Sequence, residues 1–425
     1  MKSKFSFVLV IFFVFLLAIP LSLPFETGTA QESAVLKQGA AERTSDQAAP
    51  NLTYALKLLQ QGKVTDGLDI LIRLFTSREF VQKFENLINE KIPFQVSAIR
   101  FSKAVDRSII KLAYEFTDDR VIPADMTLDF YYDTEFEQLL FTPTLFDSHA
   151  KQVIDDRIQN YQDLIQTYPD KNFYLYYHQT LHNSEFHPLN PIFPEADNGQ
   201  SLEYFEQNLP SGLTLEKFLL TSHEDHLEYY YRTDHHWRVN AIIRAYQDIY
   251  AMLSENYPDM PQPLTITKTI EFPDINFLGM MARRALYPIR ADEFVVEDVI
   301  IPPHDLIESG QKVDNIRRSI YFEGKYSTIP YINHYNAFYG DVADLIEYDF
   351  NNTSGRNLLI IGSSYQNSVD PLLASHYDRT YCVDLRYYTD FSLSTFLSER
   401  EVDDILIIGD NEVAFQDVQY WKIDP

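Results

Sequence analysis

The sequence is poor in cysteine. Cys382 is the only one among 425 residues, so no intramolecular disulfide can form, and no cysteine follows the N-terminal apolar run to accept a lipid. We interpret Cys382 as a small buried apolar residue on a strand. Internal repeats are lacking too, and outside one polar segment near the N-terminus we find no low-complexity tract.

Positive charge is scarce as well. The 35 lysine and arginine residues are outnumbered by 62 aspartates and glutamates, which gives a formal net charge of −27. Nucleic-acid phosphates and anionic lipid headgroups attract clustered Lys and Arg, so the composition argues against both partners. A neutral substrate, or one held by local contacts, fits the charge better.

The N-terminus has the pattern of an export signal. Lys2 and Lys4 precede an apolar run over residues 5–20, and Gly28-Thr29-Ala30 offers the small residues that a signal peptidase recognises. Because the run approaches the roughly 20 residues that span a bilayer, residues 1–30 are either a signal peptide or a signal anchor. The two lysines favour export of everything that follows.

Residues 31–51 have the composition of a linker, and residues 52–425 are expected to form one large domain that opens with a helical lead. Three short apolar runs near the C-terminus, residues 358–361, 381–383 and 405–408, are separated by helix-length segments. That rhythm predicts an α/β fold with a mostly parallel sheet covered by helices. Residues 258–328 fit no such pattern and are interpreted as an insertion.

A helix–strand pair precedes these runs. Residues 153–168 have helical periodicity, and residues 173–177 are strand-like. The connection that follows, residues 181–210, is long for a compact domain, and such loops are more often functional than idle. We expect it to border the site.

The first candidate for a catalytic site is the segment Thr233-Asp234-His235-His236-Trp237. It precedes a helix that the spacing of apolar residues predicts from Val239 onward. A carboxylate two residues before an imidazole can turn back to accept its Nδ1–H, which fixes the tautomer and leaves Nε2 free as a base. Asp234 and His236 have that spacing.

Two other interpretations of this segment stay open. Asp234 can simply cap the helix, with both histidines on the surface beside a buried Trp237. Alternatively, the segment contributes to a metal site, since His223-Glu224-Asp225-His226 lies just upstream. We expect neither a bound metal nor a cofactor.

The second constellation is Gly362-Ser363-Ser364, after the run at residues 358–361 and ahead of a helix expected near Asn367. A serine at a strand-to-helix turn projects its hydroxyl at the carboxyl edge of the sheet. Backbone N–H groups at the start of the helix can stabilise the oxyanion that forms when this hydroxyl attacks an acyl carbon. The alternative is an ordinary serine N-cap after a glycine turn.

Together the two segments resemble the DHHW proteins, a family related to the SGNH hydrolases and to the periplasmic acetyltransferases of alginate O-acetylation. The resemblance runs through most of the chain after the linker. It is carried by Phe84-Glu85-Asn86 to Pro93-Phe94, residues 229–237, Asn276-Phe277-Leu278-Gly279, Ala282-Arg283, residues 359–368 and residues 383–388. It implies an SGNH-hydrolase-like, flavodoxin-like three-layer α/β sandwich.

The resemblance also implies roles. Ser364 would be the nucleophile, His236 the base and Asp234 the residue that orients it, whereas His235 is less suited as the base and is kept as a residue that contacts substrate. The chain departs from the SGNH pattern in one respect, because Ser363 stands where aspartate is common. The alginate relatives accept a hydroxyl residue there.

Residues that would complete an oxyanion hole or bind substrate are less well marked. Asn411 follows the last apolar run, and Tyr365 and Asn367 come soon after Ser364. Arg386 lies at a strand end, where its guanidinium can bind a substrate carboxylate or form an ordinary ion pair with a neighbouring aspartate.

These observations predict serine-dependent O-acyl transfer, or ester hydrolysis, on an exported or cell-surface polysaccharide. The resemblance implies an acyl donor supplied by a membrane-bound O-acyltransferase. The chain would work outside the cytoplasm, secreted or anchored to the membrane by its N-terminal segment. The alternative from another class is an inactive SGNH-fold protein that binds glycan or scaffolds an export complex.

Overall fold

The computed structural model describes residues 95–114, 119–125, 127–341, 343–351, 355–415, 417–418 and 423. The export signal, the linker and most of the expected helical lead lie outside these residues. Within the described ranges no helix is both long and apolar enough to cross a membrane.

The chain divides into two compact units, one of residues 1–116 with 283–287 and the other of residues 117–282 with 288–425. In the first unit the structure describes helix α6, Gln95–Tyr114, and the segment 283–287, where Arg107 Nη1 donates a hydrogen bond of 2.7 Å to the Leu286 carbonyl. The second unit holds the elements discussed below, except that the last three residues of α11, Met280–Ala285, belong to the first.

An eight-stranded sheet forms the centre of the second unit, in the order β5-β4-β13-β11-β12-β10-β8-β9. The first five of these strands are parallel, whereas β10, β8 and β9 add antiparallel pairings at one edge. The bounds are β4 Asn172–His178, β5 Leu213–Phe218, β8 Asp305–Glu308, β9 Gln311–Val313, β10 Leu345–Asp349, β11 Asn357–Gly362, β12 Arg379–Val383 and β13 Asp404–Gly409. The expected mostly parallel sheet is confirmed.

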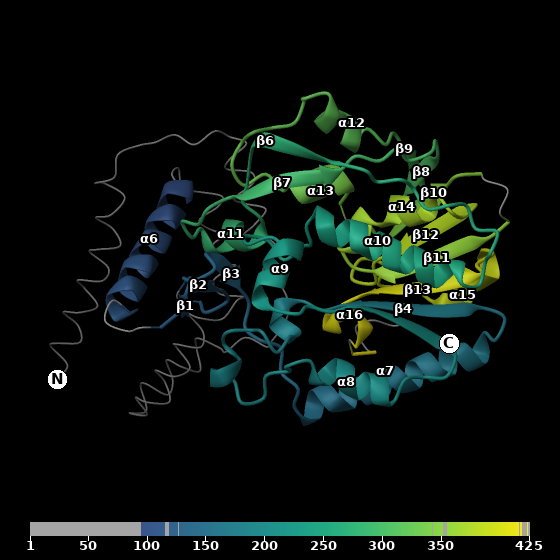
Figure 1. Cartoon of the computed structure of the whole chain (residues 1–425), viewed down its shortest axis with the longest axis horizontal. Helices are drawn as coiled ribbons and strands as arrows, with labels where there is room; N and C mark the ends of the chain where they lie inside the picture. Colours follow the sequence, from purple (N-terminus) through teal and green to yellow (C-terminus); the bar gives the residue numbers. More distant parts are fainter. Residues whose placement is uncertain are drawn as a thin grey trace, which may run out of the picture. The chain divides into compact units, whose positions relative to one another are not determined.

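Helices cover both faces of this sheet, which makes a three-layer sandwich (Figure 1). On one face lie α7 Ser148–Thr167, α8 Gln200–Gln207, α15 Leu393–Glu399 and α16 Asn411–Ala414, and on the other α10 Val239–Ser254 and α14 Asp370–Ala374. Successive strand residues point to opposite faces. In β11, for example, Leu359 and Ile361 join the core under α7, and Leu358 and Ile360 join the core under α10.

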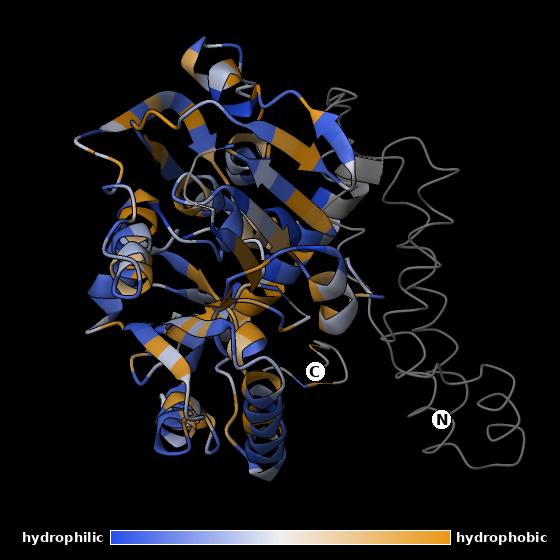
Figure 2. Ribbon diagram, turned by 90° about the vertical axis from the view of Figure 1, so that its right-hand side faces the viewer, coloured by the Kyte–Doolittle hydropathy of each residue, from blue (hydrophilic) through white to orange (hydrophobic). Residues whose placement is uncertain are grey.

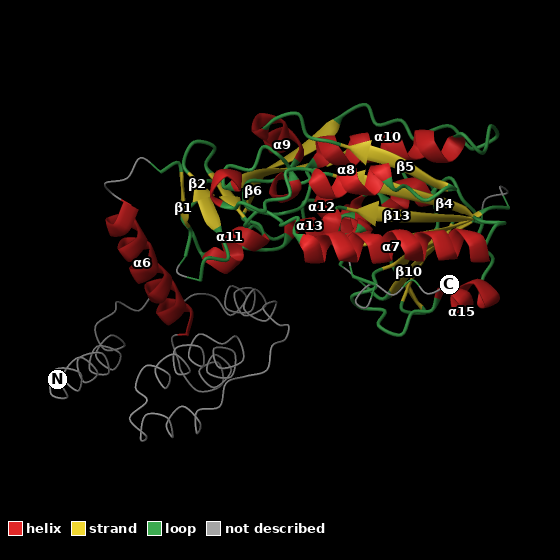
Figure 3. Cartoon of the chain, turned by 90° about the horizontal axis from the view of Figure 1, so that it is seen from below, coloured by secondary structure: helices red, strands yellow, loops and turns green. Residues whose placement is uncertain are grey.

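Burial on both faces explains why these strands are continuous apolar runs in the sequence. In the hydropathy colouring the strands that cross the centre are orange, while the surrounding helices mix blue and orange (Figure 2). Helix α7, which runs along the sheet in Figure 3, buries Ile154, Ile158, Tyr161 and Leu164 at helical spacing. It starts earlier than that periodicity predicted, because the Asp147 carboxylate caps it by accepting two backbone N–H groups.

Two smaller antiparallel sheets complete the second unit. One contains β1 Val121–Pro123, β2 Tyr131–Asp133 and β3 Gln138–Leu140, and the other contains β6 Thr269–Phe277 and β7 Asp292–Glu297. The remaining helices are α9 His223–Tyr229, α11 Met280–Ala285, α12 Arg317–Phe322, α13 His334–Tyr339 and the 3-10 turns η2 Leu181–Asn183, η3 Asn190–Ile192 and η4 Gln366–Ser368. Residues 258–328 thus form the β6–β7 sheet and also supply the two outermost strands of the main sheet, β8 and β9.

Candidate active site

Ser364 stands directly after β11, at the carboxyl edge of the parallel strands, where sites of α/β sheets form. Gly362 is the last residue of the strand, and glycine suits this position because a Cβ there would lie 2.4 Å from Gln366 Oε1 and 2.9 Å from the Ile408 carbonyl oxygen. The helix expected near Asn367 is a 3-10 turn, η4, followed by α14. Pro371 in the first turn of α14 explains this start, since proline is favoured where a helix begins and disfavoured within one.

His236 lies between Ser364 and Asp234. Its Nε2 is 2.8 Å from Ser364 Oγ, and its Nδ1 is 2.5 Å from Asp234 Oδ1. An ionised carboxylate only accepts hydrogen bonds, so the imidazole proton is on Nδ1 and the Nε2 lone pair faces the serine hydroxyl. Asp234 and His236 are buried, whereas Ser364 is partly exposed.

Among the described residues, three N–H groups donate to the Asp234 carboxylate. Oδ1 accepts the ring Nδ1–H and the backbone N–H of His236, and Oδ2 accepts the backbone N–H of Met280 at 2.5 Å. Gly279 allows this approach, because a Cβ at that position would lie 2.2 Å from Asp234 Cβ. The chain after β6 therefore forms one wall of the Asp234 site.

Asp292, the first residue of β7, fixes the backbone just before Asp234. Its carboxylate accepts the backbone N–H groups of Arg232 at 3.0 Å and Thr233 at 2.9 Å, and the Thr233 hydroxyl at 2.6 Å. The Thr233 hydroxyl oxygen in turn accepts the Gly279 N–H at 3.0 Å. Burial outweighs these bonds and raises the pKa of Asp292.

Trp237 ties the histidine segment to the serine segment. Its indole N–H donates to Ser368 Oγ at 2.7 Å and lies 3.1 Å from the Tyr335 hydroxyl, whose ring stacks on His236 at 4.0 Å. The Tyr365 hydroxyl donates to the His235 carbonyl at 2.6 Å. The two segments singled out in the sequence are thus bonded to each other at several points.

His235 is bound differently from His236. Its ring packs on His236 at 3.9 Å, but its Nδ1 is 3.5 Å from Asp234 Oδ1 and has no hydrogen-bond partner among the described residues. Burial lowers the pKa of His235 to about 3, so this ring is neutral at pH 7. The structure pairs Asp234 with His236, not with His235.

The amides of Asn411 and Asn367 are used inside the protein. Asn411 Oδ1 accepts the Tyr177 hydroxyl at 2.7 Å, and its Nδ2 donates to Asp197 at 2.6 Å. Asn367 Nδ2 donates to the Gly340 carbonyl at 3.1 Å. Both side chains are buried, so a role in an oxyanion hole stays a prediction.

Arg386 forms an ion pair with Asp384, which was the alternative to a role in binding substrate. Its Nε and Nη2 donate to the Asp384 carboxylate at 2.9 and 2.6 Å. The guanidinium side chain is nevertheless 45% exposed, so a face of it stays open to a ligand.

A polar cluster that the sequence reasoning missed lies beside the ends of β4 and β13. His182 Nε2 is 3.6 Å from Asp410 Oδ2, and the Thr180 hydroxyl is 3.1 Å from His182 Nδ1. Burial lowers the pKa of His182, but the bond to Asp410 and the charges around it outweigh burial, so the pKa is raised. Two features of the sequence could have indicated it: the long loop from residue 181, and Asp410, which follows the last apolar run after a single glycine.

The metal alternative has only part of its expected ligand set. Ligand atoms of Asp234, His235 and His236 lie within 4.8 Å of one another, a spacing at which a cation could be held. His223 and His226 do not join them, because both rings bond to Gln138. His236 also uses both of its nitrogens, for Asp234 and for Ser364.

Comparison with protein-family models gives no match, and comparison with curated proteins gives none either. Solved structures do match. Bacillus cereus PatB1 with a sulfonyl adduct superposes with a TM-score of 0.55 and 16% identity, over 70% of this chain and 97% of that one. A DHHW family protein from Eubacterium siraeum gives 0.51 and 17% over the same shares.

This chain shares their fold. The likeness to a DHHW protein and the three-layer α/β architecture expected from the sequence are therefore confirmed at the level of the fold. The O-acetyltransferase domain of Pseudomonas putida AlgJ also matches, but its TM-score of 0.35 is too low to support an argument. At these identities the fold is what the likeness establishes.

Proposed function

We propose that this chain is a serine-dependent O-acyltransferase or esterase that acts on a polysaccharide outside the cytoplasm. The observation that carries the proposal is the pair of contacts made by His236, 2.8 Å to Ser364 Oγ and 2.5 Å to Asp234 Oδ1. A nucleophile, a base and a group that orients the base within hydrogen-bond reach are what serine-dependent acyl transfer requires.

In the first half-reaction Ser364 Oγ attacks the acyl carbon of an ester while His236 Nε2 takes the hydroxyl proton. Asp234 stabilises the imidazolium that forms, and the proton then passes to the departing alcohol, which leaves an acyl group on Ser364. In the second half a sugar hydroxyl or water gives its proton to His236 and attacks the acyl carbon. Ser364 is released and regains the proton.

The substrate class and the location rest on further observations. Fold likeness to PatB1 and to a DHHW protein is consistent with this chemistry. The net charge of −27 disfavours an anionic macromolecule, and the N-terminal apolar segment favours export. Under this proposal a membrane-bound O-acyltransferase supplies the acyl group, and acetyl is the group expected.

The experiment compares the full-length protein with Ser364→Ala and His236→Ala on p-nitrophenyl acetate. We expect each variant to lose at least roughly 10³-fold in kcat/KM, because the two side chains act as one unit. Ser363→Ala, the neighbouring serine, is the matched control and should stay within a few-fold of wild type. Phenylmethylsulfonyl fluoride should label Ser364, as seen by mass spectrometry, and should fail to label the His236→Ala protein at a comparable rate.

Equal turnover by the wild type and the three variants would refute the assignment of Ser364 and His236 as catalytic residues. Glycan binding that survives Ser364→Ala, with no ester cleavage by the wild type, would point instead to the inactive, glycan-binding alternative.

A further inference from the structure

A cavity of about 30 Å³ is lined by Asp234 and by residues adjacent in sequence to His236 and Ser364. That volume holds about two water molecules, or one small group of a ligand. Its wall includes residues of the two catalytic segments, of the loop after β4 and of helix α9: Asp234, His235, Tyr365, Thr180, His182 and His226. Nothing in the proposed acyl-transfer steps uses either histidine of α9, His223 or His226.

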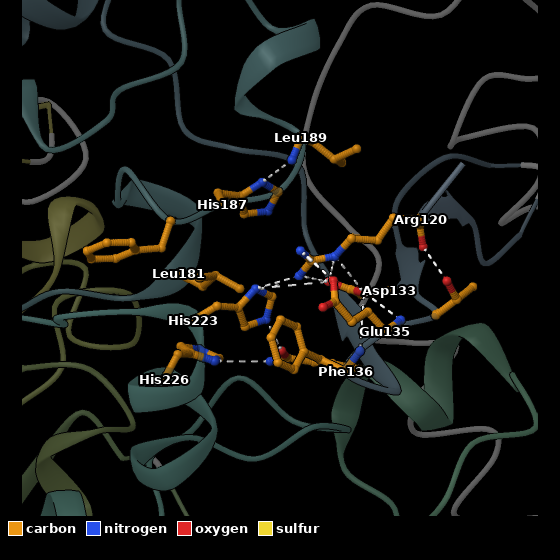
Figure 4. Close-up of polar contacts among 12 residues, drawn as sticks. Arg120, Asp133, Glu135, Phe136, Leu181, His187, Leu189, His223 and His226 are labelled. Carbon is orange, nitrogen blue, oxygen red and sulfur yellow. Dashed lines mark hydrogen bonds and ion pairs between the residues drawn. The ribbon is translucent and has the colours of Figure 1, made fainter. Parts of the chain in front are cut away.

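A chain of hydrogen bonds reaches His226 from the surface (Figure 4). Arg120 pairs with Asp133 at 2.8 Å, and its Nη2 lies 3.1 Å from His223 Nδ1. His223 Nε2 is 2.9 Å from Gln138 Oε1, and Gln138 Nε2 is 3.1 Å from His226 Nδ1. Gln138 and both histidines are buried.

Each link of this chain fixes the direction of the next. A guanidinium only donates, so His223 accepts at Nδ1 and carries its proton on Nε2. That proton requires the carbonyl oxygen of Gln138, which turns the amide N–H groups toward His226 Nδ1. The proton of a neutral His226 is therefore on Nε2.

Both histidines of the chain are neutral at pH 7. Burial lowers the pKa of His223 to about 4 and lowers that of His226 well below its usual value. His226 is 6% exposed and stacks on Tyr230 at 4.7 Å, which fixes its ring plane. The structure therefore holds a single N–H donor in one orientation at the cavity.

Among the described residues no acceptor bonds His226 Nε2, whose ring borders the cavity. Since the side chain is largely shielded from bulk water, an oxygen atom in the cavity that accepts this N–H is favoured. His235 and His226 are both neutral, and the Asp234 carboxylate is already satisfied by three N–H groups. The pKa of His182, which also lines the cavity, is raised, but Asp410 lies 3.6 Å from its ring and balances its charge. With no unbalanced positive charge among these groups for an anion, a neutral oxygen suits the cavity best.

We propose that this cavity is a subsite for a hydroxyl group of a neutral sugar, with His226 Nε2–H as the donor that positions it. Asp234 and Tyr365, the residue that directly follows Ser364, also line the cavity, and under this proposal a sugar that reacts at Ser364 places a neighbouring hydroxyl there. The inference rests on the proposed function, since it names the acceptor of the same acyl transfer.

The test uses the full-length protein with p-nitrophenyl acetate as acyl donor and glucose as acceptor. The measured quantity is the ratio of acetylglucose to acetate formed. His226→Phe keeps the stack on Tyr230 and removes the donor, so we expect this ratio to fall roughly tenfold. The control is His376→Phe, which removes another buried imidazole that stacks on a tyrosine and bonds to its hydroxyl at 2.9 Å, and it should keep the wild-type ratio.

Three outcomes would overturn the subsite. They are a wild-type ratio in His226→Phe, an equal loss of p-nitrophenolate release and of sugar transfer in that variant, and no acetylglucose from the wild type. In each of them, loss of p-nitrophenolate release in Ser364→Ala would still support the proposed function, so the two failures can be told apart.

A second variant tests the hydrogen-bond chain and not merely the presence of His226. In Gln138→Glu the carboxylate only accepts, so neutral His226 must donate from Nδ1 and Nε2 loses its proton. The carboxylate also raises the pKa of His226, and protonation at lower pH restores Nε2–H. The ionisable groups around His226 are His182, His187, His223 and Tyr230.

The ratio of sugar transfer to hydrolysis in Gln138→Glu should therefore fall as the pH rises from about 6 to 8. Because the ratio is measured within one protein, a smaller folded fraction does not change it. A ratio in Gln138→Glu that matches the wild type at every pH would overturn the assignment of the donor.

Discussion

Gly279→Ala should disable the site although Ser364, His236 and Asp234 themselves are unchanged. A Cβ at this position would stand 2.2 Å from Asp234 Cβ and 2.3 Å from Asp234 Oδ2. Ordinary contacts of a Cβ begin near 3.4 Å, so the two chain segments must separate by at least about 1 Å. Asp234 would then lose its bond to the Met280 N–H, or its bond to His236.

A misplacement of about 1 Å in a catalytic group can cost roughly 10²-fold in rate. We therefore expect kcat/KM of Gly279→Ala on p-nitrophenyl acetate to fall roughly 100-fold. Thermal unfolding, measured in parallel, should show that the variant remains folded at the assay temperature.

Gly310→Ala is the matched control. Gly310 lies in the β8–β9 turn at a φ of +75° with nothing within 4 Å of an added Cβ. Alanine there costs about 1 kcal/mol of stability through backbone strain and should leave kcat/KM unchanged. Wild-type kcat/KM in Gly279→Ala would refute the argument that this glycine sets the position of Asp234.

Three further predictions concern stability. Trp237→Phe removes the donor to Ser368 and should lower the free energy of unfolding, measured by urea titration, by roughly 2–4 kcal/mol. A change of less than about 1 kcal/mol would contradict the role of the indole. Asn411→Ala leaves the buried Asp197 short of a donor and should cost roughly 3 kcal/mol, whereas a loss of activity alone would favour the oxyanion role. Burial raises the pKa of Asp370 well above its usual value, so the folded state holds that proton more tightly and stability falls as pH rises above about 4. Asp370→Asn should flatten this fall in thermal midpoints, and an unchanged slope would refute it.

The parallel strands could be predicted from the sequence because each is buried on both faces. The runs at residues 358–361, 381–383 and 405–408 correspond to β11, β12 and β13. The antiparallel edge was not predicted. Strand β9 shows no buried residue and β8 only one, so neither carries the apolar signal of a central strand.

The candidate site also has a part that the sequence predicted and a part that it did not. Asp234 and His236 are two residues apart, so the sequence itself indicated their pairing, and the strand-to-glycine pattern marked Ser364. Their catalytic roles stay predictions. The link between His226 and Gln138 joins residues 88 apart on separate elements. A single glutamine on a short strand belongs to no sequence pattern from which this contact could have been predicted.

The order of the strands in the main sheet affects how the chain folds. Strand β13, the last of the sheet along the chain, lies between β4 and β11. Until β13 docks, β4 and β11 each present an open edge at the middle of the sheet, and such edges invite pairing with other chains. Closure joins strands far apart in sequence, which makes folding slow. The protein is therefore most exposed to aggregation until β13 has docked, and activity should return only in the last phase of refolding.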